Sequence, residues 1–469
     1  MKKFLSISVV FLVLAVLFSS YAGADSVKKS GAFSYTIKGN GTAEITAYDW
    51  SMNDDEDIYV PELIDGYKVT SIGDMAFTDK ELASEKLPDP SEFPATKHVR
   101  VHLPDSIQII GEKAFFCTDI TSVNIPAGVA SIGSGAFAGC SRITTFSVDP
   151  NNSTYAVIDG VLYNKVIKEL VAFPIGSETD EFQVPYGIKS IGPYAFFDIY
   201  DKTLICSETV TSIKEYAFYG VLGAILDLGE VVSIGDYAFA GIDPIGFISD
   251  LQLGNSLEEI GSYAFYYCNF LNFNGGYGDI IFPSSLRTIG SHAFDSYSGS
   301  HDVDLSNTYI EVIPDYCFYD SCYSSIYLPR SVKIIGDYAF SSSDLSDYIN
   351  SSGKYGMPTG LSDLSSLESI GDCAFKDARL SISQESINLP ENLKTIGSDF
   401  FENVEYRGNS EHIEQISIPA SVTSIGDSFC DKSSVVLDVE PGSYAALYAS
   451  ENGYITSNMQ NQDTSWLLS

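Results

Sequence analysis

Alternating apolar and polar positions recur along most of this chain, and many of the alternating segments end at a proline. The pattern is apolar-x-apolar-Pro, as in Val123-Asn124-Ile125-Pro126 and Ile387-Asn388-Leu389-Pro390. Alternation with a period of two predicts a strand that buries one face. Proline ends such a strand because it lacks the N–H group that a sheet requires. The sequence therefore predicts a series of short strands, each with one outward side chain between two buried ones.

A second motif, Ile-Gly-x-x-Ala-Phe, follows most of these segments. Clear copies and variants end at Phe77, Phe115, Phe137, Phe196, Phe218, Phe239, Phe265, Phe294, Phe318, Phe340 and Phe375, and two worn copies end at Phe401 and Cys430. From Phe196 to Phe340 the intervals are 22, 21, 26, 29, 24 and 22 residues, which is the range of leucine-rich repeats. Glycine permits a tight turn, and Ala-Phe is expected on a short helical turn with its ring beneath the coil.

One coil cannot bury its own apolar edges, whereas stacked neighbours can. The predicted fold class is therefore a repeat solenoid, mainly β: a leucine-rich-repeat superhelix of about 13 coils with short helical turns. One interval is longer, because Phe196 lies 59 residues after Phe137. Asp159-Gly160 between apolar runs predicts a hairpin there, in a variant coil at about residues 146–180. Asp149 and Asn151 resemble the start of a calcium loop, but Thr154 and Gly160 replace its required Gly and Glu.

The two motifs together, as Ile-Gly-x-x-Ala-Phe-x-x-Cys and Ile-Pro-x-x-Val, resemble the BspA-like (Treponema pallidum type) leucine-rich repeat family over about residues 31–455. The segments 33–46 and 64–73 are similar to the family's opening hairpin, and 441–454 to its helical closing cap. The resemblance implies an N-terminal β-hairpin cap (25–66), repeats (67–437), and a C-terminal cap and tail (438–469). It also implies adhesion to host matrix proteins, host cells or other microbes.

The first residues have the pattern of a secretory signal peptide. Met1-Lys2-Lys3 is basic, 4–18 is almost wholly apolar, and Ala22-Gly23-Ala24 is a cleavage pattern. Residues 1–24 are therefore interpreted as a signal peptide cleaved after Ala24; an uncleaved anchor is the alternative. The apolar run is shorter than the ~20 residues of a spanning helix. The expected product is secreted or at the cell surface, with no membrane span after cleavage.

The charge balance narrows the range of partners. The chain has 62 acidic and 26 basic residues, a formal net charge of −36. Nucleic acid is not expected as a partner, because its binding is driven by basic side chains that release counterions from phosphates. An anionic membrane surface is disfavoured for the same reason.

Eight cysteines in an exported chain raise the question of disulfides. Cys117, Cys140 and Cys268 each lie two or three residues after the same motif phenylalanine, a recurrence that favours small buried side chains. One or two disulfides are the second alternative. A zinc site is the third, although no C-x-x-C pair supports it.

The sequence gives no catalytic motif. It contains no G-x-S-x-G, H-E-x-x-H, phosphate loop or G-x-G-x-x-G. His98 and His102 lie four residues apart in a strand-like segment, about 13 Å, which is too far for one metal ion. The acidic run 54–57 is interpreted as a solvated loop. The chain is therefore expected not to be an enzyme, and no cofactor or metal is expected.

One set of residues is a candidate binding surface: the outward side chains of the predicted strands. They are Tyr59, His102, Asn124, Gln183, Ile205, Asp227, Gln252, Ile281, Asp304, Tyr327, Asn388 and Ser417. Amide, aromatic and acidic groups in a row could bond to a long ligand, and repeat proteins bind through extended faces. The alternative is an ordinary solvated face. Tyrosines before Ala-Phe or its variant are a further set, for ligand contact or for packing between coils: Tyr216, Tyr237, Tyr263, Tyr316 and Tyr338.

The predicted function is that of a secreted or cell-surface, non-enzymatic repeat protein that binds an extracellular protein or glycan through an extended sheet face. An extracellular polysaccharide-binding accessory protein is one alternative. A structural cell-envelope protein without a dedicated ligand is another.

Overall fold

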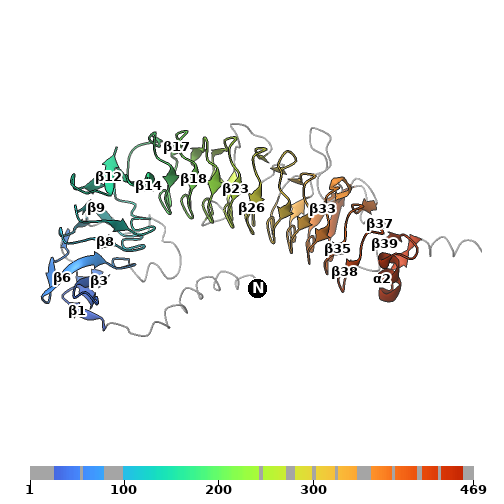
Figure 1. Cartoon of the computed structure of the whole chain (residues 1–469), viewed down its shortest axis with the longest axis horizontal. Coiled ribbons are helices and arrows are strands. Elements are labelled where there is room, and N and C mark those ends of the chain that lie inside the picture. The colour runs from blue at the N-terminus through green and yellow to red at the C-terminus, as the bar shows by residue number, and fades with distance from the viewer. Residues whose placement is uncertain are drawn as a thin grey trace, which may run out of the picture.

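The structure is a computed structural model that describes residues 26–52, 56–78, 99–241, 247–270, 280–297, 303–322, 326–345, 361–382, 386–408, 415–430 and 435–457. These residues form a mainly-β solenoid of about 14 turns, drawn as an arch in Figure 1. The repeat solenoid predicted from the motifs is confirmed. The expected signal peptide, residues 1–24, and His98 lie outside the described residues.

A complete coil has two short strands, and the first ends before the proline position. These proline-side strands are β4 (Asp57–Tyr59), β7 (Val99–His102), β9 (Ile120–Ile125), β11 (Ser147–Val148), β15 (Glu181–Gln183), β17 (Thr203–Ile205), β19 (Ile225–Asp227), β22 (Asp250–Gln252), β25 (Ile280–Ile281), β27 (Val303–Asp304), β29 (Ile326–Tyr327), β34 (Ser386–Asn388), β37 (Gln415–Ile418), β39 (Val436–Val439) and, at the end, β40 (Ile455–Thr456). They form four sheets, in the orders β4–β7–β9–β11, β15–β17–β19–β22, β25–β27–β29 and β34–β37–β39–β40.

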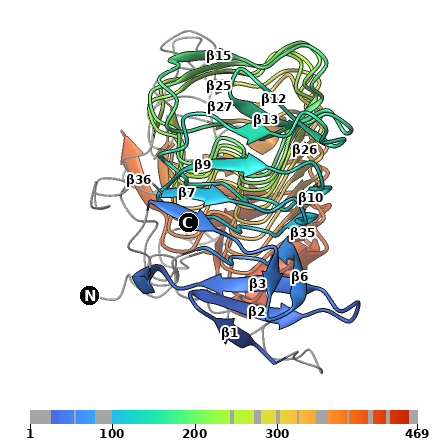
Figure 2. The same cartoon turned by 90° about the vertical axis from the view of Figure 1, so that its left-hand side faces the viewer.

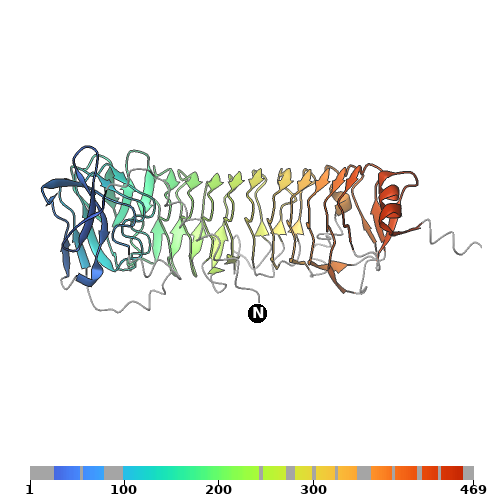
Figure 3. The same ribbon diagram turned by 90° about the horizontal axis from the view of Figure 1, so that it is seen from below.

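The second strand of a coil ends at the isoleucine of Ile-Gly, except in the variant coil and in the copies where Lys214 or Pro314 replaces glycine, and the sequence pattern did not predict this strand. These glycine-side strands are β6 (Tyr67–Ile72), β8 (Ile109–Ile110), β10 (Ser131–Ile132), β14 (Glu169–Ala172), β16 (Ser190–Ile191), β18 (Ser212–Ile213), β20 (Ser233–Ile234), β23 (Glu259–Ile260), β26 (Thr288–Ile289), β28 (Val312–Ile313), β30 (Ile334–Ile335), β32 (Ser369–Ile370), β35 (Thr395–Ile396) and β38 (Ser424–Ile425). A third set consists of β21 (Phe247–Ile248), β24 (Asn269–Phe270), β31 (Asp344–Leu345), β33 (Arg379–Ile382) and β36 (Glu405–Gly408). Figure 3 shows how strands of successive coils line up along the solenoid.

The motif phenylalanines form a column through the core. From Phe196 to Phe375, through Phe218, Phe239, Phe265, Phe294, Phe318 and Phe340, each ring stacks on the next, with centroids 4.9–5.4 Å apart. A small residue before each ring, alanine in every copy but Cys317, lets the backbones approach. The Phe218 N–H, for example, donates to the Ala238 carbonyl of the next coil at 2.7 Å. The phenylalanine therefore fills the coil interior as predicted.

The segment around Ala-Phe differs from the expected short helical turn. It forms tight turns in which two residues adopt left-handed backbone angles in most coils. One is the residue before alanine, as in Tyr237 (φ 56°); the other lies two residues after phenylalanine, as in Asp198 (φ 59°). Sequence hints of this were present, because Gly135 and Gly139 occupy these two positions in one coil.

The glycine of Ile-Gly joins adjacent coils. Its N–H donates to the isoleucine carbonyl of the preceding coil, as from Gly290 to Ile260 at 2.8 Å. At one copy Pro314 replaces glycine and cannot donate, and there the glycine-side strands separate into the β14-to-β26 and β28-to-β38 series.

The predicted hairpin in the variant coil is confirmed. β12 (Tyr155–Ile158), β13 and β14 pair antiparallel, with β13 spanning Val161–Asn164. β14 then pairs in parallel with β16, so this insertion occupies the place of a coil. The buried core divides into two clusters here, and the axis of the arch turns at β12–β14 (Figure 1).

Both ends of the described stack are covered. Strands β1 (Lys28–Ser30), β2 (Phe33–Ile37) and β3 (Ala43–Tyr48) pair antiparallel, β3 then pairs in parallel with β6, and β5 (Leu63–Ile64) pairs with β6 (Figure 2). Helix α2 (Tyr444–Asn452) closes the other end, where the Tyr448 hydroxyl donates to the Gly426 carbonyl at 2.9 Å. The 3-10 helices are η2 (Trp50–Met52) and η4 (Leu361–Asp363). No helix in the described ranges is long and apolar enough to cross a membrane.

All eight cysteines are free thiols, which is the first of the three alternatives left by the sequence. Six are buried, Cys117 is half-buried and Cys322 is exposed. The Cys140 thiol donates to the Phe115 carbonyl at 3.0 Å, and the Ser321 hydroxyl makes the same contact to Phe294 at 2.7 Å. The side chain at this recurring position, Cys140 or Ser321, thus donates a hydrogen bond that joins adjacent coils.

Candidate functional site

The outward side chains of the proline-side strands stand in register. Neighbouring pairs are Tyr59 with His102, Asn124 with Ser147, Gln183 with Ile205, Ile205 with Asp227, Asp227 with Gln252, Ile281 with Asp304, Asp304 with Tyr327, Asn388 with Ser417, and Ser417 with Asp438. We call these side chains the outward row. The structure therefore brings the sequence-predicted residues together within four sheets. In Figure 1, β17 and β37 lie along the convex edge of the arch, opposite β18, β26 and β38.

The row is not uniformly accessible. Tyr59, His102, Asn124, Gln183, Ile281 and Asn388 are exposed, and Ile205, Asp227, Gln252, Asp304 and Ser417 are half-buried. Tyr327 is only 7% exposed, so its expected place on an open face is wrong. Alternation along a strand determines which way a side chain points, but it does not reveal what other parts of the chain lie over that face.

At its N-terminal end the row contains a rigid polar and aromatic cluster. The rings of Tyr59 and His102 stack at 4.4 Å and 9°. Arg100 Nε and Nη2 donate to the two oxygens of Asp57, each at 2.8 Å, and His102 Nε2 lies 2.7 Å from Asp57 Oδ1. The Arg100 guanidinium, followed by the His102 ring, holds the pKa of Asp57 well below its usual range. Tyr59 is 66% exposed on top of this cluster.

The sequence pattern did not single out Asp57 and Arg100. Both lie two residues before a row residue on the same strand face, so the period that identified Tyr59 and His102 also reaches them. They were missed because only the residue between the two apolar positions was considered.

The carboxylates of the row accept hydrogen bonds that stabilise the fold. Asp227 Oδ1 accepts from the Gly229 N–H at 3.0 Å, and Asp304 Oδ1 from the Ser306 N–H at 2.8 Å. Each closes the turn that follows its own strand. Ser417 Oγ donates to Asp438 Oδ2 at 3.3 Å, between coils. These contacts fix the side chains without burying them.

The tyrosines before Ala-Phe form a column of their own. Tyr194, Tyr216, Tyr237, Tyr263, His292, Tyr316 and Tyr338 stack ring on ring, with centroids 4.3–4.9 Å apart and planes within 7° of parallel. Lys113 Nζ lies 4.8 Å from the Tyr194 ring centre at one end. Between Tyr194 and Tyr338 each inner ring has both faces covered by its neighbours, which leaves no face for a sugar or base to stack on. The structure supports packing between coils for this set.

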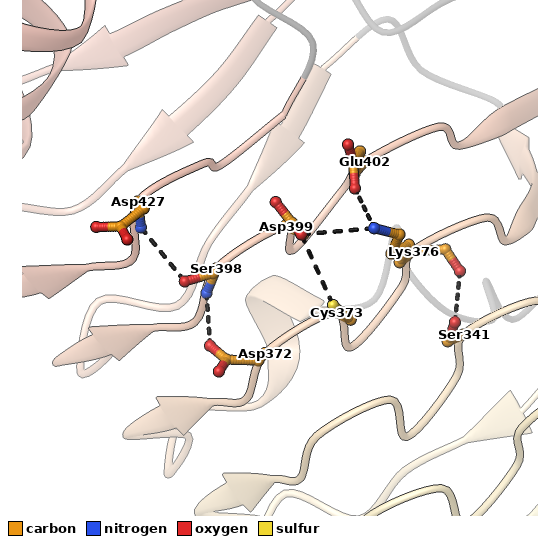
Figure 4. Close-up of polar contacts among 8 residues, drawn as sticks. All are labelled: Ser341, Asp372, Cys373, Lys376, Ser398, Asp399, Glu402 and Asp427. Atoms are coloured by element: carbon orange, nitrogen blue, oxygen red, sulfur yellow. Dashed lines mark hydrogen bonds and ion pairs between the residues drawn. The ribbon is translucent and has the colours of Figure 1, made fainter.

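A polar network near the C-terminal end of the solenoid, drawn in Figure 4, is also made of contacts between coils. Ser398 N donates to Asp372 Oδ1 at 2.7 Å, and Asp427 N donates to Ser398 Oγ at 3.3 Å; all three residues occupy the same motif position. Beside them Lys376 pairs with Asp399 at 3.5 Å and with Glu402. Each bond ties one coil to the next, so these contacts stabilise the stack of coils.

The calcium-like segment also has a local structural role. Asp149 Oδ1 accepts from the Asn151 N–H at 2.8 Å, and Asn152 Nδ2 donates to the Pro126 and Val129 carbonyls at 2.8 and 2.9 Å. Within the described parts of the chain, no group of three His, Cys, Asp or Glu residues is placed to hold a metal ion.

Comparisons with solved structures find several bacterial leucine-rich repeat proteins. A leucine-rich repeat protein from Bacteroides ovatus is 17% identical over 94% of this chain and 99% of that one, with a TM-score of 0.40. One from Eubacterium ventriosum is 18% identical over 76% and 95%, with a TM-score of 0.37. A leucine rich cell surface protein from Faecalibacterium prausnitzii is 18% identical over 92% and 98%, with a TM-score of 0.21. No curated protein matches the chain.

The family itself is established by the repeats. The BspA type leucine rich repeat region matches residues 70–175, 171–278, 273–355 and 360–440, in six copies. These matches cover most of the solenoid and coincide with the stacked coils described above. The chain therefore belongs to the BspA-type leucine-rich repeat family.

Proposed function

We propose that this protein is an exported, non-enzymatic binding protein that adheres to an extracellular macromolecule through the outward row. The observation that carries the proposal is the register of that row, which repeats exposed polar and aromatic side chains from coil to coil. Its best-formed part is the cluster of Tyr59, His102 and Arg100 on Asp57.

This cluster has the properties of a binding hot spot. Tyrosine and arginine dominate hot spots in protein interfaces. The bonds to Asp57 hold Arg100 and His102 in place before any partner arrives, which lowers the entropy cost of binding. Stacking on the His102 ring likewise holds the Tyr59 ring in place. The absence of a catalytic grouping among the described residues gives no support to an enzymatic role.

A binding screen of the exported chain against matrix proteins and polysaccharides tests the proposal. The paired variant is Tyr59→Ala with Asn388→Ala, two exposed row residues in separate sheets. Truncation of a hot-spot tyrosine costs about 2 kcal/mol or more, so binding of a true partner should weaken at least tenfold.

The matched control is Tyr186→Ala, because Tyr186 is 79% exposed but lies outside the row. A protein partner lost in the row variant and kept in the control supports adhesion. Polysaccharide binding with the same pattern would favour the accessory-protein alternative. Binding that both variants leave intact, or no binding to any macromolecule, would contradict the proposal.

A further inference from the structure

An exposed aliphatic pair lies at the tip of the hairpin in the variant coil, where the arch turns (Figure 1). Between β13 and β14 the chain turns through residues 165–168, and Val166 and Ile167 there are 64% and 57% exposed. Asn164 Oδ1 accepts from the N–H groups of both residues, at 3.0 and 3.2 Å. The turn therefore holds two branched aliphatic side chains in solvent in a fixed position.

Three exposed lysines lie around this pair. Lys165 and Lys168 flank it in the chain, and Lys189 lies beside Lys168, because its N–H donates to the Lys168 carbonyl at 2.7 Å. Lys165 Nζ donates to the Asn152 carbonyl at 2.6 Å, which is a neutral acceptor. Among the residues that the structure describes, none of the three lysines forms an ion pair. The tip is thus a positively charged site on a chain whose formal net charge is −36.

The nearest carboxylates do not cancel this charge. In residues 151–168 the sole acidic residue is Asp159, which precedes β13 at the end opposite the tip. Glu169, the first residue of β14, is half-buried. Burial raises the pKa of Glu169, and the charges of Lys214 and Glu215 act on it in opposite directions. The local sum of these charges stays positive.

The same register position is balanced in charge farther along the solenoid. The residue before a glycine-side strand donates its N–H to the matching carbonyl of the preceding coil in most coils. In the C-terminal half this position alternates in sign, through Glu311, Lys333, Glu368 and Lys394, and Lys333 pairs with Glu311 at 2.7 Å. At β14 and β16 it holds two neighbouring lysines instead. Like charges on neighbouring strands are destabilising, so this pair calls for a negatively charged partner from outside the chain.

The combination of lysines and aliphatic side chains selects the class of that partner. A polyanionic glycan would contact the lysines but leave the aliphatic pair in water. An anionic bilayer would contact both, but it is an extended negative plane that repels a chain of net charge −36. A short protein segment approaches only the tip, and charges farther away than the Debye length of ~8 Å are largely screened.

We propose that the tip of this hairpin, together with Lys189, binds a partner protein through a segment that carries aliphatic residues between carboxylates. The aliphatic side chains of the partner pack on Val166 and Ile167, and its carboxylates pair with Lys168 and Lys189. This second interaction surface uses none of the residues of the outward row, so it does not depend on the proposed function.

Titration of labelled peptides into the full chain, read by fluorescence anisotropy, tests the partner chemistry. The first peptide is Gly-Glu-Leu-Leu-Glu-Gly. Gly-Glu-Ser-Ser-Glu-Gly keeps its charges without the aliphatic pair, and Gly-Lys-Leu-Leu-Lys-Gly keeps the aliphatic pair with the opposite charge. The first peptide should bind at least fivefold more tightly than either of the others, and its affinity should fall as salt screens the ion pairs.

Two variants separate the two parts of the surface. Lys168→Gln with Lys189→Gln should lower the affinity for the first peptide at least fivefold. Its melting midpoint should be unchanged or higher, because the variant removes a pair of like charges. Val166→Ser with Ile167→Ser should also lower the affinity at least fivefold and should fold normally, because both side chains are exposed.

The matched control is Lys333→Gln with Lys394→Gln. It removes the same charge from two exposed lysines at the same register position, in coils where the neighbouring residues are acidic. Exposed ion pairs contribute little to stability, so this variant should fold and keep the affinity within twofold.

Equal binding of the first two peptides, an equal loss in the control, or no measurable binding of the first peptide would overturn the inference. Phosphatidylglycerol vesicles provide one further test: binding to them that the tip variants abolish, without a preference among the peptides, would assign the tip to a membrane and would also overturn it. Each of these results leaves the proposed function to its own test, because Tyr59 and Asn388 are unchanged in every one of these variants.

Discussion

At the scale of single residues, this fold has a recurrent backbone cost, because tyrosines before Ala-Phe or its variant adopt left-handed φ angles. Tyr194, Tyr216, Tyr237, Tyr263, Tyr316 and Tyr338 all have φ of 56–57°. For a residue with a side chain, this conformation costs roughly 1–2 kcal/mol. A ring inside the column has two stacked neighbours, and each aromatic pair is worth about 0.5–1.5 kcal/mol beyond its buried area. Stacking therefore offsets the backbone cost, most fully for a ring that has a stacked neighbour on both faces.

This balance predicts an inverted order for substitutions at Tyr237, between Tyr216 and Tyr263. Tyr237→Ala loses both stacks and keeps the backbone cost, whereas Tyr237→Gly loses the stacks and relieves it. Both variants should have a lower melting temperature than the parent protein. The melting temperature of Tyr237→Gly should be equal to or higher than that of Tyr237→Ala. Tyr186 has no such backbone angle, so there Tyr186→Ala should have a higher melting temperature than Tyr186→Gly. A higher melting temperature for Tyr237→Ala than for Tyr237→Gly would contradict this balance between backbone cost and stacking.

The cysteines give a second prediction at this scale. Denatured without reductant, the chain should titrate as eight thiols, because none is bonded. In the folded protein Cys322 should react first, since it is exposed. The buried thiols should react slowly, because burial raises the pKa of Cys140 to about 11 and of Cys206 to about 12 and so suppresses the reactive thiolate. Cys322→Ser should remove the fast phase; fewer than eight thiols after denaturation would indicate disulfides.

At the scale of elements, the Ile-Gly glycine is required by close approach between coils. A Cβ on Gly290 would lie 2.3 Å from Ser262 N and 2.5 Å from the Gly261 carbonyl carbon, both backbone atoms. The proline-side strands could be predicted because alternation with proline is a strong local signal. The glycine-side strands are only two residues long in most coils, so they have no period to detect and form only because their neighbours pair with them.

This contact predicts that Gly290→Ala destabilises the solenoid by about 1–3 kcal/mol, the usual cost of overpacking. The control is Gly39→Ala, because a Cβ there meets nothing within 4 Å. Because Gly39→Ala introduces no strain, it should leave stability unchanged or raise it slightly, since alanine lowers the conformational entropy of the unfolded chain. Equilibrium unfolding in denaturant measures both. Equal stability of the two variants would mean that the coils can move apart at Gly290 without cost.

At the scale of the whole molecule, the repeat architecture and the approximate number of coils could be derived from sequence, about 13 expected against about 14 turns observed, because each motif copy reports the same geometry. Features that depend on several coils could not. Tyr327 follows the pattern of an outward residue yet is buried. The turn of the arch at β12–β14 arises where the core divides, which no single motif encodes.

The tyrosines couple the stability of the whole arch to alkaline pH. Burial raises the pKa of Tyr155, Tyr216 and Tyr263 above the ordinary 10.0, and the hydrogen bond to Asp65 raises that of Tyr35 to about 12. The folded state therefore holds these protons more tightly than the unfolded chain. The stability that this contributes is fully present below pH 10 and is lost as pH rises through 10 towards 12 and beyond.

Titration of tyrosinate absorbance, together with circular dichroism, should show two populations in the folded protein. Exposed tyrosines should ionise first, while the secondary structure is unchanged. The column should ionise only as the solenoid unfolds, because burial raises the pKa of its members, as at Tyr216 and Tyr263. In denaturant all tyrosines should titrate together, near their ordinary value. Tyr35→Phe should remove one of the late protons. A single titration near pH 10 in the folded protein, with the circular dichroism intact, would show that the column does not hold its protons and that its stacking is looser than the 4.3–4.9 Å spacing requires.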